Sequence, residues 1–212
     1  MSLILNLETS TKNCSISIAK NGICLTSIEE CSEQYFHSEK LHMFIQYATK
    51  IAKISLHDLK SICVSKGPGS YTSLRIGVAA AKGLCYSLDI PLLSVDSLTV
   101  MVQKINIKNG FLIPMIHAKS DLFYTSLFNE SKERLSSIFI KKINDNFFKI
   151  KNKEVFFFSN IDFLEKKLFF FRKKNRFFSK IFPSAMDMSL ISYKKFCKKK
   201  FNNIEKFIPF YL

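Results

Sequence analysis

The residues of this sequence best suited to chemistry lie in a glycine-rich stretch that reads KGPGSYTSLRIG. Gly67, Gly69 and Ser70 form a turn that opens a helix, and the unpaired N–H groups at a helix N-terminus attract an anion such as phosphate. Tyr71 and Arg75 follow in the first turns of that helix. The stretch is not a Walker A loop, because no Gly-Lys-Ser/Thr follows at the required spacing. It therefore indicates either an anion- or nucleotide-facing loop or a plain tight turn.

A second polar turn follows the first strand-like run of the sequence. Glu8, Thr9 and Ser10 could contact a nucleotide phosphate or satisfy the backbone of their own turn. Neither turn is accompanied by a catalytic or metal-binding pattern. His37 and His42 are five residues apart, whereas a helical pair of metal ligands needs four. We therefore expect no catalytic residue, no metal and no cofactor that belongs to this chain alone.

Two helix-like segments carry faces that are suited to packing. Glycine inside a helix destabilises it by ~1 kcal/mol relative to alanine, so the presence of Gly77 and Gly83 requires an explanation. Close approach of another backbone would explain it. The candidate faces comprise Leu41, Phe44, Ile45 and Ala48 on the first helix, and Ser73, Gly77, Ala80, Ala81 and Leu84 on the second. These faces predict either an interface with a partner helix or packing onto the chain's own sheet.

The elements that position these residues begin with strands. Residues 3–7, 14–20 and 23–30 are strand-like, and an Asn-Gly pair between the last two is typical of a type I′ hairpin turn. The pattern then predicts, in order, a helix over 37–53, a strand over 61–65, a helix from 70 to about 86, a strand over 91–95 and a helix to about 104.

The second half of the sequence starts in the same order as the first. It predicts a strand over 111–116 and a hairpin of strands over 122–129 and 134–141. Order and spacing alone, without sequence identity, favour two α/β units, which we expect to occupy residues 1–105 and 106–212. Residues 147–182 hold 12 of the 22 phenylalanines and define no clear element before a final helix that starts near Pro183.

Composition excludes several classes of protein. The chain has 212 residues, of which 47% are hydrophobic, so it is too apolar for a disordered chain and long enough for two small domains. We expect a cytoplasmic protein without a membrane span, because there is no signal-like segment and no Cys-x-x-Cys pair, and no run approaches ~18 apolar residues.

The formal net charge of +15 has two explanations. It suggests a basic RNA-binding module, but 28 of the 32 basic residues are lysine, which is what AT-rich codons encode. The charge is also uneven: residues 1–110 hold 11 basic and 8 acidic residues, a net of +3, while residues 111–212 hold 21 and 9, a net of +12. The two halves therefore have different jobs or different degrees of constraint.

These stretches together resemble the TsaB (YeaZ) family of tRNA threonylcarbamoyladenosine biosynthesis proteins. The clearest match is the GPGSYTSLRIG run with its continuation AAAKGL. Further matches follow in the expected order at residues 8–11, 37–41, 90–92, 95–98, 182–185 and 209–212. The match is dense over residues 3–128 and thin from 130 to 180.

The resemblance implies an α/β protein with an actin/sugar kinase/Hsp70-like fold, made of two ribonuclease-H-like halves with mixed sheets. It implies a non-catalytic, heterodimeric partner of TsaD, the paralogue that transfers threonylcarbamoyl from threonylcarbamoyl-AMP to N6 of adenosine 37, in tRNAs reading codons that begin with A. TsaE joins this complex, tRNA is reached through it, and a nucleotide can lie at its interface. In this family the first two helices pack against those of TsaD, or self-associate.

The sequence departs from the family pattern in its second half. The usual Ile-Asp-Ala-Arg and Glu-Val-Tyr are replaced by Ile-His-Ala-Lys at residues 116–119 and Leu-Phe-Tyr at residues 122–124. The matches therefore favour a structural role. The alternatives are a metallopeptidase- or kinase-like enzyme, which would need a metal triad or an acidic phosphate-transfer pair, and a basic RNA-binding module.

Overall fold

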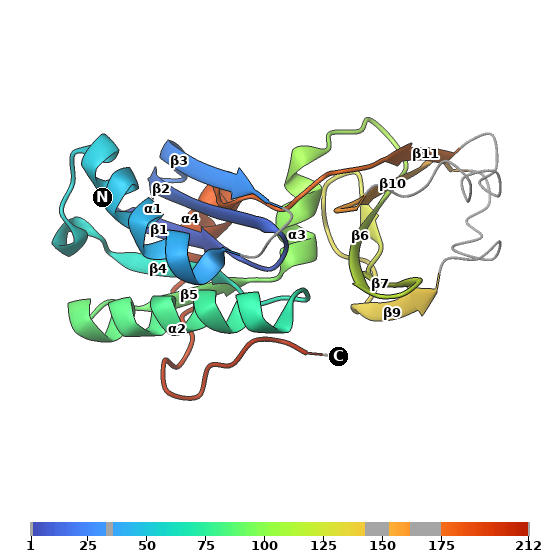
Figure 1. The fold of residues 1–212 in the computed structure, drawn as a ribbon. Helices are drawn as coiled ribbons and strands as arrows, with labels where there is room; N and C mark the ends of the chain where they lie inside the picture. The colour runs from blue at the N-terminus through green and yellow to red at the C-terminus, as the bar shows by residue number, and fades with distance from the viewer. Residues whose placement is uncertain (1, 33–35, 143–152, 162–174, 212) are drawn as a thin grey trace. The chain divides into compact units, whose positions relative to one another are not determined.

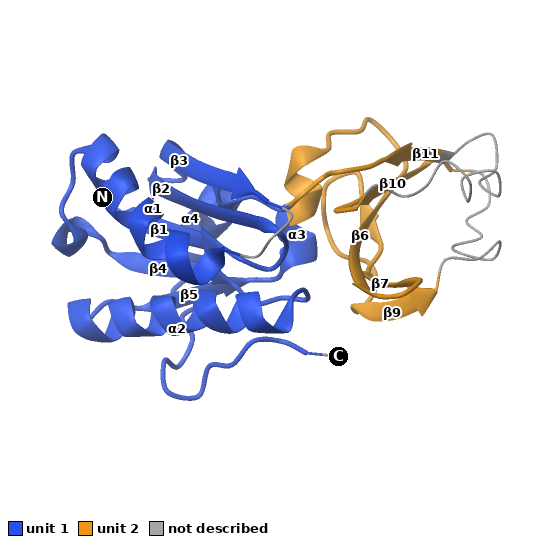
Figure 2. Cartoon of the chain, in the orientation of Figure 1, with its two compact units in different colours: residues 1–100, 183–211 blue, residues 101–182, 212 orange. Residues whose placement is uncertain are grey.

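The computed structural model describes residues 2–32, 36–142, 153–161 and 175–211. The chain divides into two compact units, which Figure 2 distinguishes by colour. Unit 1 comprises residues 1–100 and 183–211, and unit 2 comprises residues 101–182. None of the described helices is long and apolar enough to cross a membrane.

Unit 1 is built on a five-stranded mixed sheet with the strand order β3-β2-β1-β4-β5. The central strand β1 is antiparallel to β2 and parallel to β4. Asn21 and Gly22 join β2 to β3 with φ of 51° and 86°, as expected for a type I′ turn. The strands are β1 Leu3–Glu8, β2 Asn13–Lys20, β3 Ile23–Cys31, β4 Ser61–Ser65 and β5 Leu92–Val95. The sequence predicted all five to within two residues.

Helices cover both faces of this sheet, so β1 is buried along its whole length. The helices α1 (His37–Ala52) and α2 (Tyr71–Leu88) contact each other and pack on Leu5 and Leu7. The alternate residue of β1, Ile4, points to the opposite face. That face is covered by α3 Ser97–Met101, by the 3-10 turn η4 Ala185–Met188 and by α4 Ser189–Cys197, and Figure 1 shows α4 behind the sheet. Two further 3-10 turns among the described residues are η1 Leu56–Asp58 and η2 Val102–Lys104.

Unit 2 repeats the sheet of unit 1. Its strand order is β11-β10-β6-β7-β9, in which β6 pairs in parallel with β10 and antiparallel with β7. The strands are β6 Phe111–Lys119, β7 Leu122–Thr125, β8 Phe128–Asn129, β9 Phe139–Lys142, β10 Val155–Ser159 and β11 Asn175–Phe178. Strands β9-β7-β6-β10-β11 thus match β3-β2-β1-β4-β5 in order and direction. The predicted fold class, an α/β protein with two mixed sheets, is confirmed.

The predicted second hairpin differs from the structure in both of its strands, since the strand expected over 134–141 is β9, which begins at Phe139. The segment predicted as a single strand over 122–129 is divided into β7 and β8. Strand β7 pairs with β9 on one side and with the end of β6 on the other, whereas β8 pairs with Phe111 and Leu112 at the start of β6. The Ser126 hydroxyl donates to the Ser136 carbonyl at 2.8 Å and thus holds the segment where the strand breaks.

The division into units also differs from the two consecutive halves expected over 1–105 and 106–212. Residues 183–211 return to unit 1, because Ala185 and Met188 complete the core on the far face of its sheet. Polar bonds hold the same segment, since the Ser17 hydroxyl donates to the Ala185 carbonyl at 2.7 Å. Unit 1 is therefore discontinuous in sequence, and unit 2 is inserted into it.

Candidate functional site

The two polar turns singled out in the sequence contact each other in unit 1. The backbone N–H of Ser70, the N-cap of α2, donates to the Ser10 carbonyl at 2.8 Å. A Cβ on Gly69 would lie 2.1 Å from that same oxygen, so only glycine permits the approach. An amide that could have faced an anion is thus occupied by the chain itself. This geometry favours the tight-turn interpretation of the glycine-rich stretch.

The two glycines inside α2 have different surroundings. A Cβ on Gly77 would lie 2.3 Å from the Thr9 Oγ1, so this glycine lets the helix approach the turn after β1. A Cβ on Gly83 would meet nothing within 4 Å, and this residue is exposed. A close approach therefore exists at Gly77, but the approaching group is the Thr9 side chain of the same unit rather than another backbone. Gly83 is the glycine that faces outward.

Glu8 is buried at the centre of this contact and carries the most perturbed carboxyl group of the site. The backbone N–H of Ser10 donates to its Oε1 at 2.7 Å. Desolvation by burial raises the pKa of Glu8 to about 7, although hydrogen bonds from Ser10 and Ser65 act in the opposite direction. At neutral pH the carboxyl is therefore poised between its two protonation states. Its negative form would oppose an anion bound at this point.

Tyr71 and Arg75 lie on the exposed side of the same helix end. The Arg75 Nη1 donates to the Tyr71 Oη at 2.6 Å, and the guanidinium carbon lies 5.3 Å from the Tyr71 ring centroid. The Tyr71 ring also lies 4.9 Å, centroid to centroid, from that of Tyr211 near the end of the chain. These two candidates thus interact with each other and with the C-terminal segment.

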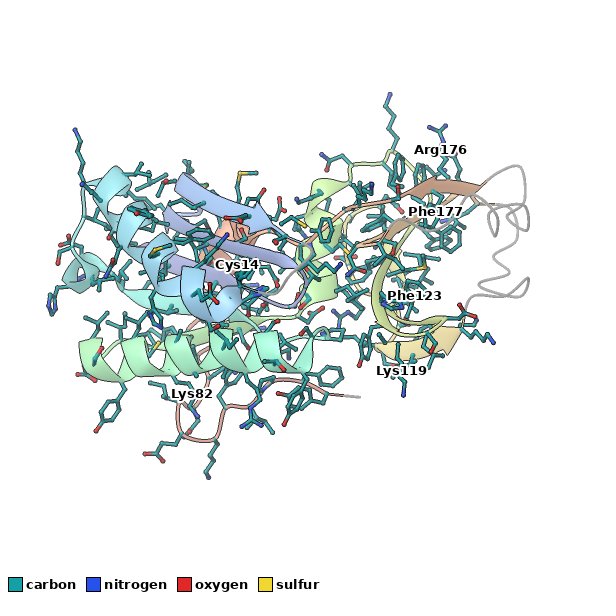
Figure 3. All side chains as sticks on the ribbon, viewed as in Figure 1. Cys14, Lys82, Lys119, Phe123, Arg176 and Phe177 are labelled. Carbon is teal, nitrogen blue, oxygen red and sulfur yellow. The ribbon has the colours of Figure 1, made fainter. Side chains whose placement is uncertain are left out.

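The C-terminal segment, residues 202–211, was not assigned a place from the sequence. It runs beside α2, and Figure 3 shows Lys82 directed toward it. The Lys82 Nζ donates to the carbonyls of Glu205 and Phe207 at 3.0 and 3.3 Å. The Phe210 N–H donates to the Lys66 carbonyl at 2.7 Å, which fixes the segment against the glycine-rich turn. The family-like ending at residues 209–212 was the available signal.

The helical faces predicted as a partner interface lie inside the chain. Exposure does not exceed 9% for Leu41, Phe44, Ile45, Ala48, Ser73, Ala80 and Ala81; Gly77 is also buried, and Leu84 is half-buried. Most of them belong to the core between the helices and the sheet. Packing onto the chain's own sheet therefore explains their spacing. All of them except Leu84 are therefore buried within this fold.

A second apolar stripe on α1 is exposed, and the sequence analysis missed it. Met43, Tyr47 and Ile51 are 44%, 53% and 62% exposed. Their four-residue spacing places them on one face of the helix, and this spacing was readable from the sequence. On α2 the corresponding outward positions include Gly83 and Tyr86, of which the tyrosine is 84% exposed.

Metal chemistry finds no support in the described part of the chain. No group of three or more His, Cys, Asp or Glu side chains there could hold a metal ion. At the divergent motif of unit 2, the His117 Nε2 lies 2.8 Å from the Ser120 carbonyl and the ring stacks edge-on with Phe123. That histidine thus stabilises the turn between β6 and β7.

Comparison with known proteins gives consistent matches. A sequence model of the family described as "TsaD: tRNA N6-adenosine threonylcarbamoyltransferase" matches residues 30–204. The TsaB protein of Buchnera aphidicola subsp. Schizaphis graminum is 31% identical over 160 residues, which are 71% of this chain and 75% of that protein. The TsaB protein of Buchnera aphidicola subsp. Acyrthosiphon pisum is 32% identical over 135 residues, 63% of this chain and 60% of its own.

A solved structure agrees with these sequence matches. YeaZ from Pseudomonas aeruginosa superposes with a TM-score of 0.83 at 22% identity, and the match covers 100% of both chains. The fold, the glycine-rich turn and the family match define a protein of the TsaD-related class. Within that class, this chain belongs to the TsaB (YeaZ) family.

Proposed function

We propose that this chain is a non-catalytic subunit in the formation of N6-threonylcarbamoyladenosine at position 37 of tRNAs that read codons beginning with A. In this role it binds and supports TsaD, which carries out the transfer, and works together with TsaE. The names of its relatives support the pathway, since they are tRNA threonylcarbamoyladenosine biosynthesis proteins. The exposed surface of α1 carries the proposal.

The exposed stripe on α1 is the observation that favours a protein-binding role. Met43, Tyr47 and Ile51 are large, adjacent along one helix face and each more than 40% exposed. Apolar residues exposed singly are ordinary, but a contiguous row marks a binding surface. Burial of a fully exposed side chain of this kind contributes roughly 1.5–3 kcal/mol. Because these three are 44%, 53% and 62% exposed, covering them contributes about half of that each, which supports a helix–helix contact. We place the contact with TsaD, or with a second copy of this chain, on this stripe.

The neighbouring helix α2 adds a site of close approach to this surface. Gly83 is exposed and a side chain there would meet nothing within 4 Å, while Tyr86 is 84% exposed. A partner helix can therefore come nearer at Gly83 than at any bulky residue. This placement replaces Gly77, whose neighbour is the chain's own Thr9.

The test of the interface is heterodimer formation with TsaD of the same organism, measured by calorimetric titration and light scattering. Ile51→Glu places a charge in the stripe and is expected to weaken the dimer at least tenfold. Ile23→Glu is the matched control, because Ile23 is 72% exposed in the same unit but lies on the edge strand β3. An unchanged affinity for the Ile51 variant would contradict the interface assignment.

The subunit role is tested by reconstitution of tRNA modification with TsaD and TsaE. Product should form with this chain present and should fall to background without it. Equal amounts of product in both reactions would contradict the proposed function, whatever the dimer measurements show. Repeating the dimer titration with adenine nucleotides tests whether a nucleotide binds at the interface. If it does, the nucleotide should raise the affinity of the two proteins for each other.

A further inference from the structure

A pocket in unit 1 lies at the C-terminal end of α4, away from the α1–α2 surface and from the glycine-rich turn. Its volume is about 300 Å³. It is lined by Ser2, Asn21, Tyr193, Phe196, Cys197, Lys199 and Phe201. Three of these are aromatic, and the rings of Phe196 and Phe201 meet edge to face with centroids 5.9 Å apart. The pocket is therefore open to a flat, ring-shaped ligand group.

Lys199 lines this aromatic pocket, and further lysines are adjacent in sequence to its lining residues. Lys198, Lys199 and Lys200 follow α4 directly, and all three are exposed, as is Lys194 in the last helical turn. Lys20, on the hairpin next to the lining residue Asn21, is also exposed. Within the part of the chain that the structure describes, none of Lys194, Lys198 and Lys200 is paired with a carboxylate. Their charge is thus available to an external anion.

The backbone of this lysine loop is held in place. The N–H groups of Lys198 and Lys200 donate to carbonyls in the last turns of α4 at 3.2 and 3.0 Å. The Asn202 N–H donates to the Leu92 carbonyl on strand β5 at 2.8 Å. The neighbouring Lys195 has a different use, because its Nζ donates to the Ser94 carbonyl at 2.6 Å inside the unit. The exposed lysines therefore project from a fixed loop, which lowers the entropic cost of binding.

We propose that this pocket and its lysines bind a single-stranded segment of RNA, with an unstacked base against the aromatic rings and its phosphates against the lysines. Stacking on aromatic side chains combined with a basic track is how proteins hold single-stranded nucleic acid. An acidic peptide would satisfy the lysines but has no flat base to fill the pocket. The proposal rests on the proposed function only in its choice of tRNA as the RNA.

The electrostatic part is tested with the full chain and an unmodified transcript of a tRNA that carries adenosine 37, by fluorescence anisotropy over a range of salt concentrations. The variant Lys198→Glu/Lys200→Glu is expected to bind at least tenfold more weakly. Its plot of log K against log salt should be shallower by about 1.4, since each phosphate contact contributes about 0.7. The control Lys108→Glu/Lys119→Glu changes the net charge equally at two exposed lysines of unit 2. Equal effects of the two variants would overturn the site.

The aromatic part is tested with Phe201, which is 42% exposed, so its removal leaves the core intact. Phe201→Ala should weaken binding roughly tenfold without changing the salt slope, because stacking on a ring carries no charge. Phe201→Tyr keeps the ring and should restore the affinity. Wild-type affinity for the alanine variant, or full displacement of the tRNA by a polyglutamate peptide, would overturn the proposal, as would no binding at about 0.1 M salt.

Thermal unfolding and TsaD binding are measured for every variant, and they separate the two proposals. If the lysine and Phe201 variants of the protein still bind TsaD and bind RNA with wild-type affinity, the pocket proposal is refuted and the subunit role is not. A wild-type chain that binds RNA as expected but not TsaD would refute the subunit role and leave the pocket standing.

Discussion

The two units share a strand order but differ in the connection between their first two strands. In unit 1, residues 9–12 join β1 to β2, and this turn contacts Gly69, which precedes α2, and Gly77 within α2. In unit 2, only Ser120 and Asp121 join β6 to β7, with φ of 52° at Ser120. A sheet topology can thus be repeated while the polar turn at the end of its central strand is not. The turn and its glycine-bearing helix belong to unit 1.

The strands next to the central strand of each sheet also differ in burial. Seven of the eight residues of β2 are buried, whereas only two of the four residues of its counterpart β7 are buried. The described core of unit 2 consists mainly of large aromatic and aliphatic side chains, among them Phe123 and Phe157. The described core cluster of unit 2 thus contains two phenylalanines among five residues, while the main cluster of unit 1 consists mostly of leucine, isoleucine and valine. Substitutions can measure this difference.

The largest effect is expected in the core of unit 2. Phe157 lies on β10 with 0% exposure, and its replacement by alanine should cost about 3–5 kcal/mol of the free energy of unfolding. The control is Phe178→Ala on β11, where the ring is 38% exposed and the loss should be much smaller. Urea titration followed by circular dichroism measures both. Similar losses would show that the aromatic core does not dominate unit 2.

The next effect is a pH dependence that belongs to unit 1. Because burial raises the pKa of Glu8 from 4.5 to about 7, its stabilising contribution is complete below pH 4.5 and is lost as the pH rises through about 7. The lost free energy is on the order of 3 kcal/mol. Glu8→Gln should flatten the dependence between pH 5 and pH 8 in denaturant titrations, whereas Glu39→Gln on the exposed surface of α1 should leave it in place. A wild-type stability constant across this range would contradict the burial argument.

A somewhat smaller loss is expected at Gly77. Gly77→Ala brings a Cβ to 2.3 Å from the Thr9 Oγ1 and should destabilise unit 1 by about 1–3 kcal/mol, although alanine favours the helix. Adding Thr9→Ala removes the two nearest atoms, Oγ1 and Cγ2, and should recover part of the loss. Chemical denaturation of the two single variants and the double variant measures the coupling. Strict additivity would mean that the turn and the helix do not constrain each other.

The smallest effect is a gain at Gly83, the matched position on the same helix. A Cβ there meets nothing within 4 Å, so Gly83→Ala should raise the free energy of unfolding by about 0.5–1 kcal/mol. The thermal midpoint of the isolated chain measures this gain. A bulkier Gly83→Phe should leave the chain stable and weaken the TsaD dimer. Loss of stability in the alanine variant would mean that the outward face is covered within the chain.

Local patterns predicted the elements of unit 1 well because they act over short distances. The alternation over residues 14–20 and the turn at Asn21 and Gly22 define β2 and β3 without reference to the rest of the fold. The helical spacing of apolar residues predicted which helix faces are buried, but not which elements cover them. Packing on a sheet and packing on a partner demand the same spacing, so Leu41 and Ala81 were equally compatible with both.

Long-range relations were the part that the sequence concealed. Nothing local at Ala185 indicates that it will bond to Ser17, which lies 168 residues earlier. The contact between Thr9 and Gly77 was equally hidden, although the glycine itself signalled a close approach. The sequence pattern defined no element within residues 147–182. Part of this range lies outside the described residues, and strands β10 and β11, which lie in its described part, were not predicted.

The discontinuity of unit 1 sets the order in which the chain becomes able to fold during synthesis. A ribosome delivers β1 first, but the segment that closes the far face of that sheet, including Ala185 and Met188, emerges only near the end. Unit 2 occupies consecutive residues and is complete as soon as residue 182 has left the exit tunnel. The unit that begins first is therefore finished last, which reverses the usual N-to-C order of domain folding. Until then, the nascent sheet of unit 1 exposes Ile4, Cys63 and Leu93 to whatever chaperone meets it.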